Sequence, residues 1–115
     1  MSSIAILRVS VVLALTITLM PMYLLGLALD FLFGQRIVIL LIKKLWSRAV
    51  MKIIGIEWEL IGLKSEAHVF VSNHISWIDI LAINCILDVV FIAKKEVRSW
   101  PGLGVLATLG QTIFI

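Results

Sequence analysis

The longest apolar run in the chain covers residues 9–29 and holds 21 positions without a charged side chain. About 20 apolar residues in a helix are enough to cross a bilayer, so the run predicts a membrane-embedded helical segment. Pro21 interrupts helical hydrogen bonding, so two interpretations remain equally open. One is a single spanning helix, and the other is a helix that is broken near Pro21 and re-enters one leaflet. A cleaved signal peptide fits less well, because only Arg8 precedes the run and no clear cleavage site follows it.

A second helix is predicted over residues 35–54, and its pattern changes along its length. Residues 37–42 are apolar all round, whereas the helix becomes amphipathic from Lys43 onward. We expect it to lie among lipid headgroups with its basic side chains toward phosphates. The alternative is a helix packed on a domain core with a solvated basic face. The polar side holds Lys44, Ser47, Arg48 and Lys52, and the apolar side holds Leu45, Trp46, Ala49, Val50 and Ile53.

Gly55 is a typical helix end, and the pattern changes after it. The order of predicted elements, β-β-α-β-α-β, indicates an α/β domain with parallel strand pairs. We therefore expect membrane-embedded and amphipathic helices over residues 1–54 and a partial α/β domain over residues 55–115. About 60 residues is small for a parallel sheet covered on both faces, so we expect the front portion of a longer protein. The predicted strands are 56–62, 68–72, 89–93 and 112–115, and the predicted helices are 77–87 and 103–109.

Composition supports a membrane protein. The chain is 62% hydrophobic and only 15% charged, with a mean hydropathy of +1.14. Half of its ten Lys and Arg residues fall within residues 36–52, where no acidic residue occurs, and such a patch suits an anionic lipid surface better than nucleic acid. The positive-inside rule then places everything after Leu29 on the cytoplasmic side. The single cysteine, Cys85, excludes a disulfide within the chain and reads as a buried free thiol.

One histidine and one aspartate are the candidate chemical groups. His74 follows an apolar run, and Asp79 lies five residues later, after Ser76. If Ser76 caps a helix that starts there, Asp79 in the first turn can orient one nitrogen of His74 and leave the other free as a base. Ser76 as an enzymic nucleophile is disfavoured, and a plain capping box with a satisfied polar His74 is the structural alternative. His68, His74 and Cys85 do not have the spacing of a zinc site, so no metal is expected.

The stretch Asn73-His74-Ile75-Ser76-Trp77-Ile78-Asp79 resembles the N-H-x-S-x-x-D block of the glycerolipid acyltransferases. This family includes 1-acyl-glycerol-3-phosphate (lysophosphatidic acid) acyltransferase. A second stretch agrees in content and distance: residues 91–96 (FIAKKE) and 100–104 (WPGLG) resemble the family's A-K-x-E-L … P-x-x-G stretch. Residues 110–115 (GQTIFI) resemble the strand that leads into its F-I-D-R block, which is incomplete here, and the later E-G-T block is absent.

The resemblance implies a general base at His74, an orienting partner at Asp79, and motif-shaping roles for Asn73 and Ser76. It implies acyl transfer from acyl-CoA or acyl-carrier protein, without a further cofactor, to the hydroxyl of a lysophospholipid in phospholipid biosynthesis. The alternative is a catalytically silent, membrane-anchored fragment or small membrane protein that lacks the acceptor-phosphate site. Substrate-binding positions would be Lys94, Lys95, Pro101, Gly104 and Gly110, for which turn chemistry and a solvated strand end are the plain alternatives.

Overall fold

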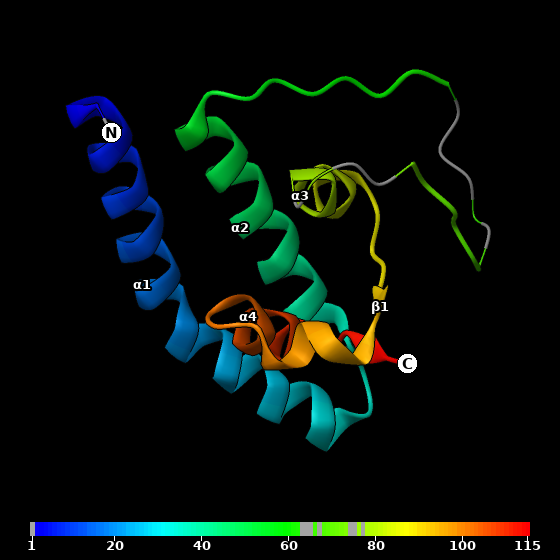
Figure 1. The fold of residues 1–115 in the computed structure, drawn as a ribbon. Coiled ribbons are helices and arrows are strands. Elements are labelled where there is room, and N and C mark those ends of the chain that lie inside the picture. The colour runs from blue at the N-terminus through cyan, green and yellow to red at the C-terminus, as the bar shows by residue number, and fades with distance from the viewer. Residues whose placement is uncertain (1, 63–65, 67, 74–75, 77) are drawn as a thin grey trace.

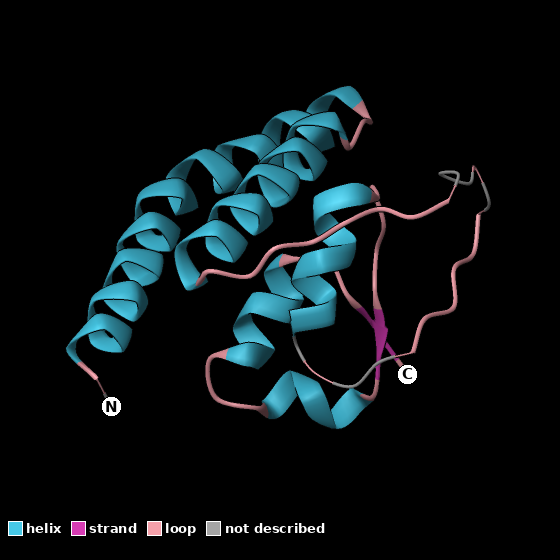
Figure 2. Cartoon of the chain, turned by 90° about the horizontal axis from the view of Figure 1, so that it is seen from above, coloured by secondary structure: helices cyan, strands magenta, loops and turns pink. Residues whose placement is uncertain are grey.

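The computed structural model describes residues 2–62, 66, 68–73, 76 and 78–115. Two long helices lie side by side and antiparallel, and the shorter helices and the strands lie on one side of this pair (Figures 1 and 2). The described part is mostly helical, with one pair of short strands. The α/β class is therefore present only as this strand pair and the helices beside it.

Helix α1 covers Ser3–Phe33 and is longer than its uncharged run. The Ser2 hydroxyl accepts a hydrogen bond from the Ala5 amide at its start, and Gly34 ends it in the left-handed conformation, with φ of 65°. The helix is continuous through Pro21, so the alternative of a helix broken there is not seen, and the helix axis curves along its length (Figure 1). By length and composition, α1 is the one described helix that is able to cross a membrane.

Helix α2 covers Ile37–Ile54 and returns along α1. The two helices are joined at both ends: the Asp30 carboxylate accepts from the Val38 and Ile39 amides, and Arg8 donates to the Ile54 carbonyl over 3.1 Å. Between these ends, Gly26 allows a close approach, because a Cβ there would lie 2.8 Å from a methyl group of Val38. The pair is thus packed along its whole length.

Helix α3 covers Ile78–Ile86 and packs on the face of α2 that α1 leaves open. Leu81 and Cys85 of α3 form the buried core with Val50 and Met51 of α2. Trp46 lies at the edge of this core and donates its indole N–H to the Thr16 hydroxyl over 3.0 Å. The core therefore connects the N-terminal helices directly with α3.

The C-terminal part contains β1 (Ile92–Ala93), the 3₁₀ helix η1 (Lys95–Ser99), α4 (Leu103–Leu109) and β2 (Ile113–Phe114). The strands are parallel, with Ile92 opposite Ile113 and Ala93 opposite Phe114, as the predicted βαβ order requires. The short helix after Gly102 has the predicted bounds, whereas η1 was not predicted.

Two predicted strands are wrong. Residues 56–62 and the described residues 68–72 are extended but form no strand. Their apolar side chains are largely in the open, with Ile61 86% and Val71 96% exposed. A strand is stable only when its backbone groups pair with a neighbour, and within the described residues neither segment pairs with β1 or β2. The apolar pattern that predicts these strands is present, but among the described residues no strand lies beside either segment.

Candidate active site

The predicted catalytic motif lies where an extended segment enters α3. Asn73 is exposed at the end of this segment, and its carbonyl accepts from the Ser72 hydroxyl over 3.2 Å. His74 lies outside the described residues, as do Ile75 and Trp77. The general-base assignment of His74 therefore stays a prediction.

Ser76 and Asp79 are brought together by the start of α3. The Asp79 carboxylate accepts a hydrogen bond from the Ser76 amide over 3.1 Å, and the Asp79 amide donates to the Ser76 carbonyl over 3.1 Å. The first bond is the carboxylate half of a capping box, and the negative charge in the first turn stabilises the helix N-terminus. The expected position of Asp79 in the first turn of the helix is thus confirmed, and the bond that it makes is the one expected of the capping-box alternative.

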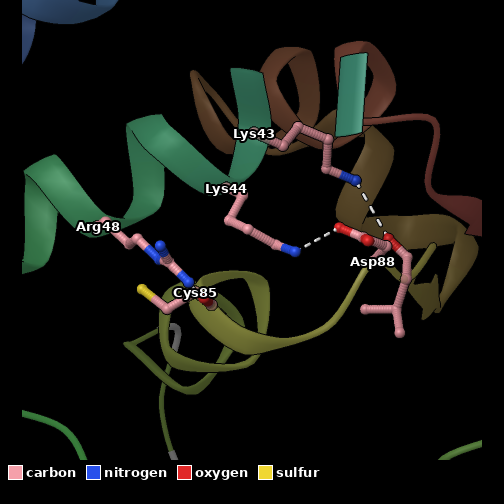
Figure 3. A network of polar contacts seen from close by, with 6 residues as sticks. Lys43, Lys44, Arg48, Cys85 and Asp88 are labelled. Atoms are coloured by element: carbon pink, nitrogen blue, oxygen red, sulfur yellow. Dashed lines mark hydrogen bonds and ion pairs between the residues drawn. The ribbon is translucent and has the colours of Figure 1, made fainter. Parts of the chain in front are cut away.

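The far end of α3 is held by basic side chains of α2, as Figure 3 shows. Arg48 donates from Nε to the Cys85 carbonyl over 3.0 Å, and Lys44 forms an ion pair of 2.8 Å with Asp88. Lys43 donates to the Val89 carbonyl just beyond. The last carbonyls of a helix lack partners within it and carry partial negative charge, so cations are favoured there.

This arrangement corrects the predicted orientation of α2. Lys44 and Arg48, expected to point toward lipid phosphates, are engaged with the end of α3, and Ser47 on the same predicted side is fully buried. Lys52 alone of that side remains exposed without a bond in the described part of the chain. The helical pattern gave the two sides of α2 but did not show that the basic side faces another helix.

Burial also sets the chemistry of Cys85. Its side chain has no exposed surface, and this burial raises the pKa of the thiol, although the nearby Arg48 charge acts in the opposite direction. A thiol with a raised pKa carries little of the reactive thiolate at neutral pH. The prediction of a buried free cysteine is confirmed.

The remaining predicted site residues surround η1 and α4. Lys94 and Lys95 are exposed and follow the carboxyl end of β1, which is where parallel sheets present ligand-binding groups. Pro101 is exposed in the turn before α4. No hydrogen bond or ion pair between described residues connects the two lysines with Ser76. Binding roles for these residues stay predictions.

Both predicted site glycines, Gly104 and Gly110, have structural roles. At Gly104, a Cβ would lie only 2.1 Å from the Arg98 carbonyl oxygen, so α4 approaches η1 more closely than any side chain permits. Gly110 ends α4, and its carbonyl accepts from Lys43 over 3.3 Å. The described geometry thus accounts for both positions through packing and hydrogen bonding.

Three residues that hold the helices to one another or to the C-terminal part were not singled out from the sequence as contacts. Tyr23 of α1 donates its hydroxyl to the Leu109 carbonyl, Asp30 caps α2, and Lys43 donates to two carbonyls. A signal existed for Asp30, which is a lone acid at the end of an apolar run and just before a helix. Tyr23 and Lys43 carried no such signal. No three His, Cys, Asp or Glu side chains of the described residues come together as a metal site would require.

Comparison with known proteins identifies the family. The sequence profile of a family described as acyltransferase matches residues 59–115, a range that includes the motif, η1 and α4. A lyso-ornithine lipid O-acyltransferase from Brucella abortus (strain 2308) is 34% identical over 109 residues, which are 93% of this chain and 39% of the relative. The chain belongs to the glycerolipid acyltransferase family.

Two further relatives agree. A lyso-ornithine lipid O-acyltransferase from Rhizobium meliloti (strain 1021) is 39% identical over 72 residues, 61% of this chain and 25% of the relative. A 1-acyl-sn-glycerol-3-phosphate acyltransferase from Neisseria gonorrhoeae is 46% identical over 44 residues, 38% of this chain and 17% of the relative. The chain thus spans about a quarter to two fifths of the length of the two lyso-ornithine lipid relatives. No solved structure matches it significantly.

Family membership and the apolar α1 together suggest that the protein associates with a membrane. Both kinds of relative are named as enzymes that acylate a lysolipid, and a lysolipid acceptor resides in or at a bilayer. Membrane association is therefore compatible with both the sequence composition and the family.

Proposed function

We propose that this chain carries the catalytic motif of an enzyme that transfers an acyl group from a thioester to the free hydroxyl of a lysolipid. The observation that carries the proposal is the acyltransferase match over residues 59–115, which contains the N-H-x-S-x-x-D motif. His74 serves as general base, and Asp79 orients it. Asn73 and Ser76 shape the turn of the motif.

The proposed reaction needs only a base and a positioned donor. His74 removes the proton from the acceptor hydroxyl, and the oxygen attacks the thioester carbonyl carbon. The new C–O bond forms, the C–S bond breaks, and the leaving thiolate takes the proton from the imidazolium. What supports the role of Asp79 is its place in the first turn of α3, within the motif and held by the Ser76 amide.

The acceptor and donor are proposed by class. The relatives named above act on lyso-ornithine lipid or on 1-acyl-sn-glycerol-3-phosphate, and both present a free hydroxyl to an acyl donor. We propose a lysolipid of one of these kinds as acceptor and acyl-CoA or acyl-carrier protein as donor. Lys94 and Lys95, at the carboxyl end of β1, are the proposed contacts for an anionic acceptor group. We also propose that residues 55–115 lie on the cytoplasmic side.

An acyl-transfer assay with paired histidine variants tests the proposal. The full chain, and the complete gene product if the gene extends beyond residue 115, is supplied in detergent–lipid micelles with labelled acyl-CoA or acyl-carrier protein and each acceptor. We expect His74→Ala to lower turnover by roughly 10²- to 10⁴-fold, which is the usual contribution of a general base. Ser76→Ala should keep much of the activity, because the backbone amide that bonds to Asp79 is unchanged.

His68→Ala is the matched control. His68 is the other histidine of the chain, it is exposed, and it lies before the motif. Normal turnover of His74→Ala would remove the base assignment. Absence of product from the 115-residue chain, with product from a longer gene product, would show that this chain alone is the silent fragment of the alternative interpretation.

A further inference from the structure

The Lys43 ammonium lies between two segments that are far apart in the sequence. It donates to the Val89 carbonyl over 3.3 Å and to the Gly110 carbonyl over 3.3 Å. Val89 follows α3 and leads into β1, whereas Gly110 follows α4 and leads into β2. One side chain of α2 therefore contacts the entry to each of the two parallel strands.

The two carbonyls are equivalent in the register of the strand pair. Val89 lies three residues before Ile92, and Gly110 lies three residues before Ile113, which is the residue paired with Ile92. The ammonium thus joins a pair of positions that the ladder itself would place opposite each other. A slip by one residue would move one of these carbonyls away from Lys43.

The strand pair has little else to fix its register. Each strand is two residues long. Ile92 and Ile113 are exposed, and Ala93 and Phe114 on the other face are only partly buried, so burial specifies the pairing weakly. A one-residue slip would turn every side chain after it to the opposite face. The residues directly after β1 are Lys94 and Lys95.

The surroundings hold Lys43 in place. Its neighbour in sequence, Lys44, pairs with Asp88, the residue before Val89, so consecutive lysines of α2 hold consecutive residues of the chain (Figure 3). From α1, Tyr23 donates to the Leu109 carbonyl, the residue before Gly110. Both strand entries are thereby held by the N-terminal helix pair.

We propose that Lys43 is a positioning residue, which fixes the register of β1 against β2 by holding the Val89 and Gly110 carbonyls with one ammonium group. Through it, the N-terminal helices determine where Lys94 and Lys95 present their charges. This role rests on the proposed function for its effect on catalysis, but its effect on the strands does not depend on that function.

Hydrogen–deuterium exchange of the full chain in detergent–lipid micelles tests the structural half. The amides of Ile113 and Ile115 donate across the strand pair to Phe91 and Ala93. We expect Lys43→Met to speed exchange at these two amides by about tenfold or more, since local opening becomes easier. Lys43→Arg keeps the positive charge and the donors and should restore most of the protection. Lys52→Met, with the same change on an exposed residue of α2, should leave exchange at both amides unchanged.

Steady-state kinetics test the catalytic half. For Lys43→Met we expect KM for the lysolipid acceptor to rise by about fivefold to tenfold, with a smaller change in kcat, because binding groups are displaced while the base remains. Recovery in Lys43→Arg supports the proposal. A fall in kcat at constant KM, which is the result of partial unfolding, overturns it, as does unchanged exchange at Ile113 and Ile115. If neither the wild type nor any variant transfers acyl groups, the proposed function fails. The exchange experiment then still decides the role of Lys43.

Discussion

At the scale of single residues, the basic side chains of α2 show what the sequence pattern left out. Lys43, Lys44 and Arg48 all end on carbonyls or a carboxylate near the C-terminal end of α3. A helical projection separates a basic side from an apolar one. However, the C-terminal end of another helix, with its unpaired carbonyls, attracts the same cations as a phosphate surface does. The choice between these partners depends on tertiary contacts that one element's pattern does not contain.

The charge on Lys43 predicts a defined pH dependence of stability. Burial lowers the pKa of Lys43 below its ordinary value of 10.5, and the Arg36 charge lowers it further, whereas Asp88 acts in the opposite direction. Between the lowered pKa and 10.5, the unfolded chain binds a proton that the folded chain has released. Stability from this group is therefore fully present above pH 10.5 and is lost as the pH falls through the lowered pKa.

We therefore expect the wild-type chain to gain stability relative to Lys43→Met as the pH rises toward 10.5. Urea unfolding of both proteins in the same detergent at pH 7, 8, 9 and 10 measures this difference, and other titrating groups cancel because both chains contain them. A wild-type advantage that shrinks as the pH rises would contradict the direction of the pKa shift.

The motif residues gave the opposite lesson, because local rules were sufficient for them. The capping-box alternative for Ser76 and Asp79 predicts a carboxylate that accepts from the Ser76 amide, and the structure contains that bond, whereas the pairing of Asp79 with His74 stays a prediction. A capping contact involves residues three apart, so the sequence holds both partners side by side. Tyr23 and Lys43 have partners 86 and 67 residues away, and no local pattern indicates such pairs.

At the scale of elements, helices were predicted well and strands poorly. The bounds of α2, α3 and α4 agree with prediction to within two residues, because helical hydrogen bonds are internal to each segment. A strand requires a neighbour, so residues 56–62 and 68–72 kept the strand pattern without becoming strands. The parallel pair β1 and β2 formed where Lys43 of α2 holds the Val89 and Gly110 carbonyls, which precede the two strands.

The contact between α1 and α2 predicts a large effect at Asp30. Its buried carboxylate accepts from the Ile39 amide over 3.0 Å and from the Val38 amide over 3.4 Å, so it caps a helix other than its own. We expect Asp30→Ala to lower the free energy of unfolding by about 1–3 kcal/mol, because buried amides at the start of α2 lose their acceptor. Urea unfolding in detergent, followed by circular dichroism, measures this loss.

Asp30→Asn is the informative partner variant. The amide oxygen of Asn still accepts one hydrogen bond, whereas the negative charge at the helix N-terminus is removed. Its stability should lie between those of Asp30→Ala and the wild type. Equal stability of all three proteins would show that the cap contributes nothing to the packing of α2 on α1.

At the scale of the whole molecule, the way the helix pair is packed restricts how it meets a membrane. Arg8 near the start of α1 bonds to the end of α2, and Asp30 near the end of α1 bonds to the start of α2. Midway along the pair, Tyr23 and Lys43 contact the end of α4. The apolar side chains of α3 pack on Val50 and Met51. One side of the pair is therefore occupied by protein along much of its length.

A bilayer-spanning arrangement would place α3, α4 and their charged contacts inside the hydrocarbon, where unpaired polar groups are costly. The exposed apolar residues of α1 instead leave one side of the pair open to lipid. They include Leu13, Ile17, Leu24, Leu25 and Phe31. We therefore expect α1 to lie in one leaflet, with both of its ends on the same side of the membrane as residues 55–115.

Cysteine labelling in sealed vesicles of known orientation tests this expectation. In a Cys85→Ala background, Ser3→Cys and Gln35→Cys mark the two ends of α1, and Glu66→Cys marks the following part of the chain; all three positions are exposed. A membrane-impermeant maleimide should label all three from one side and none from the other, with the cysteine-free chain as control. If α1 crossed the membrane, its 31 residues would place Ser3 and Gln35 on opposite sides, and only one of these two variants would react from each side.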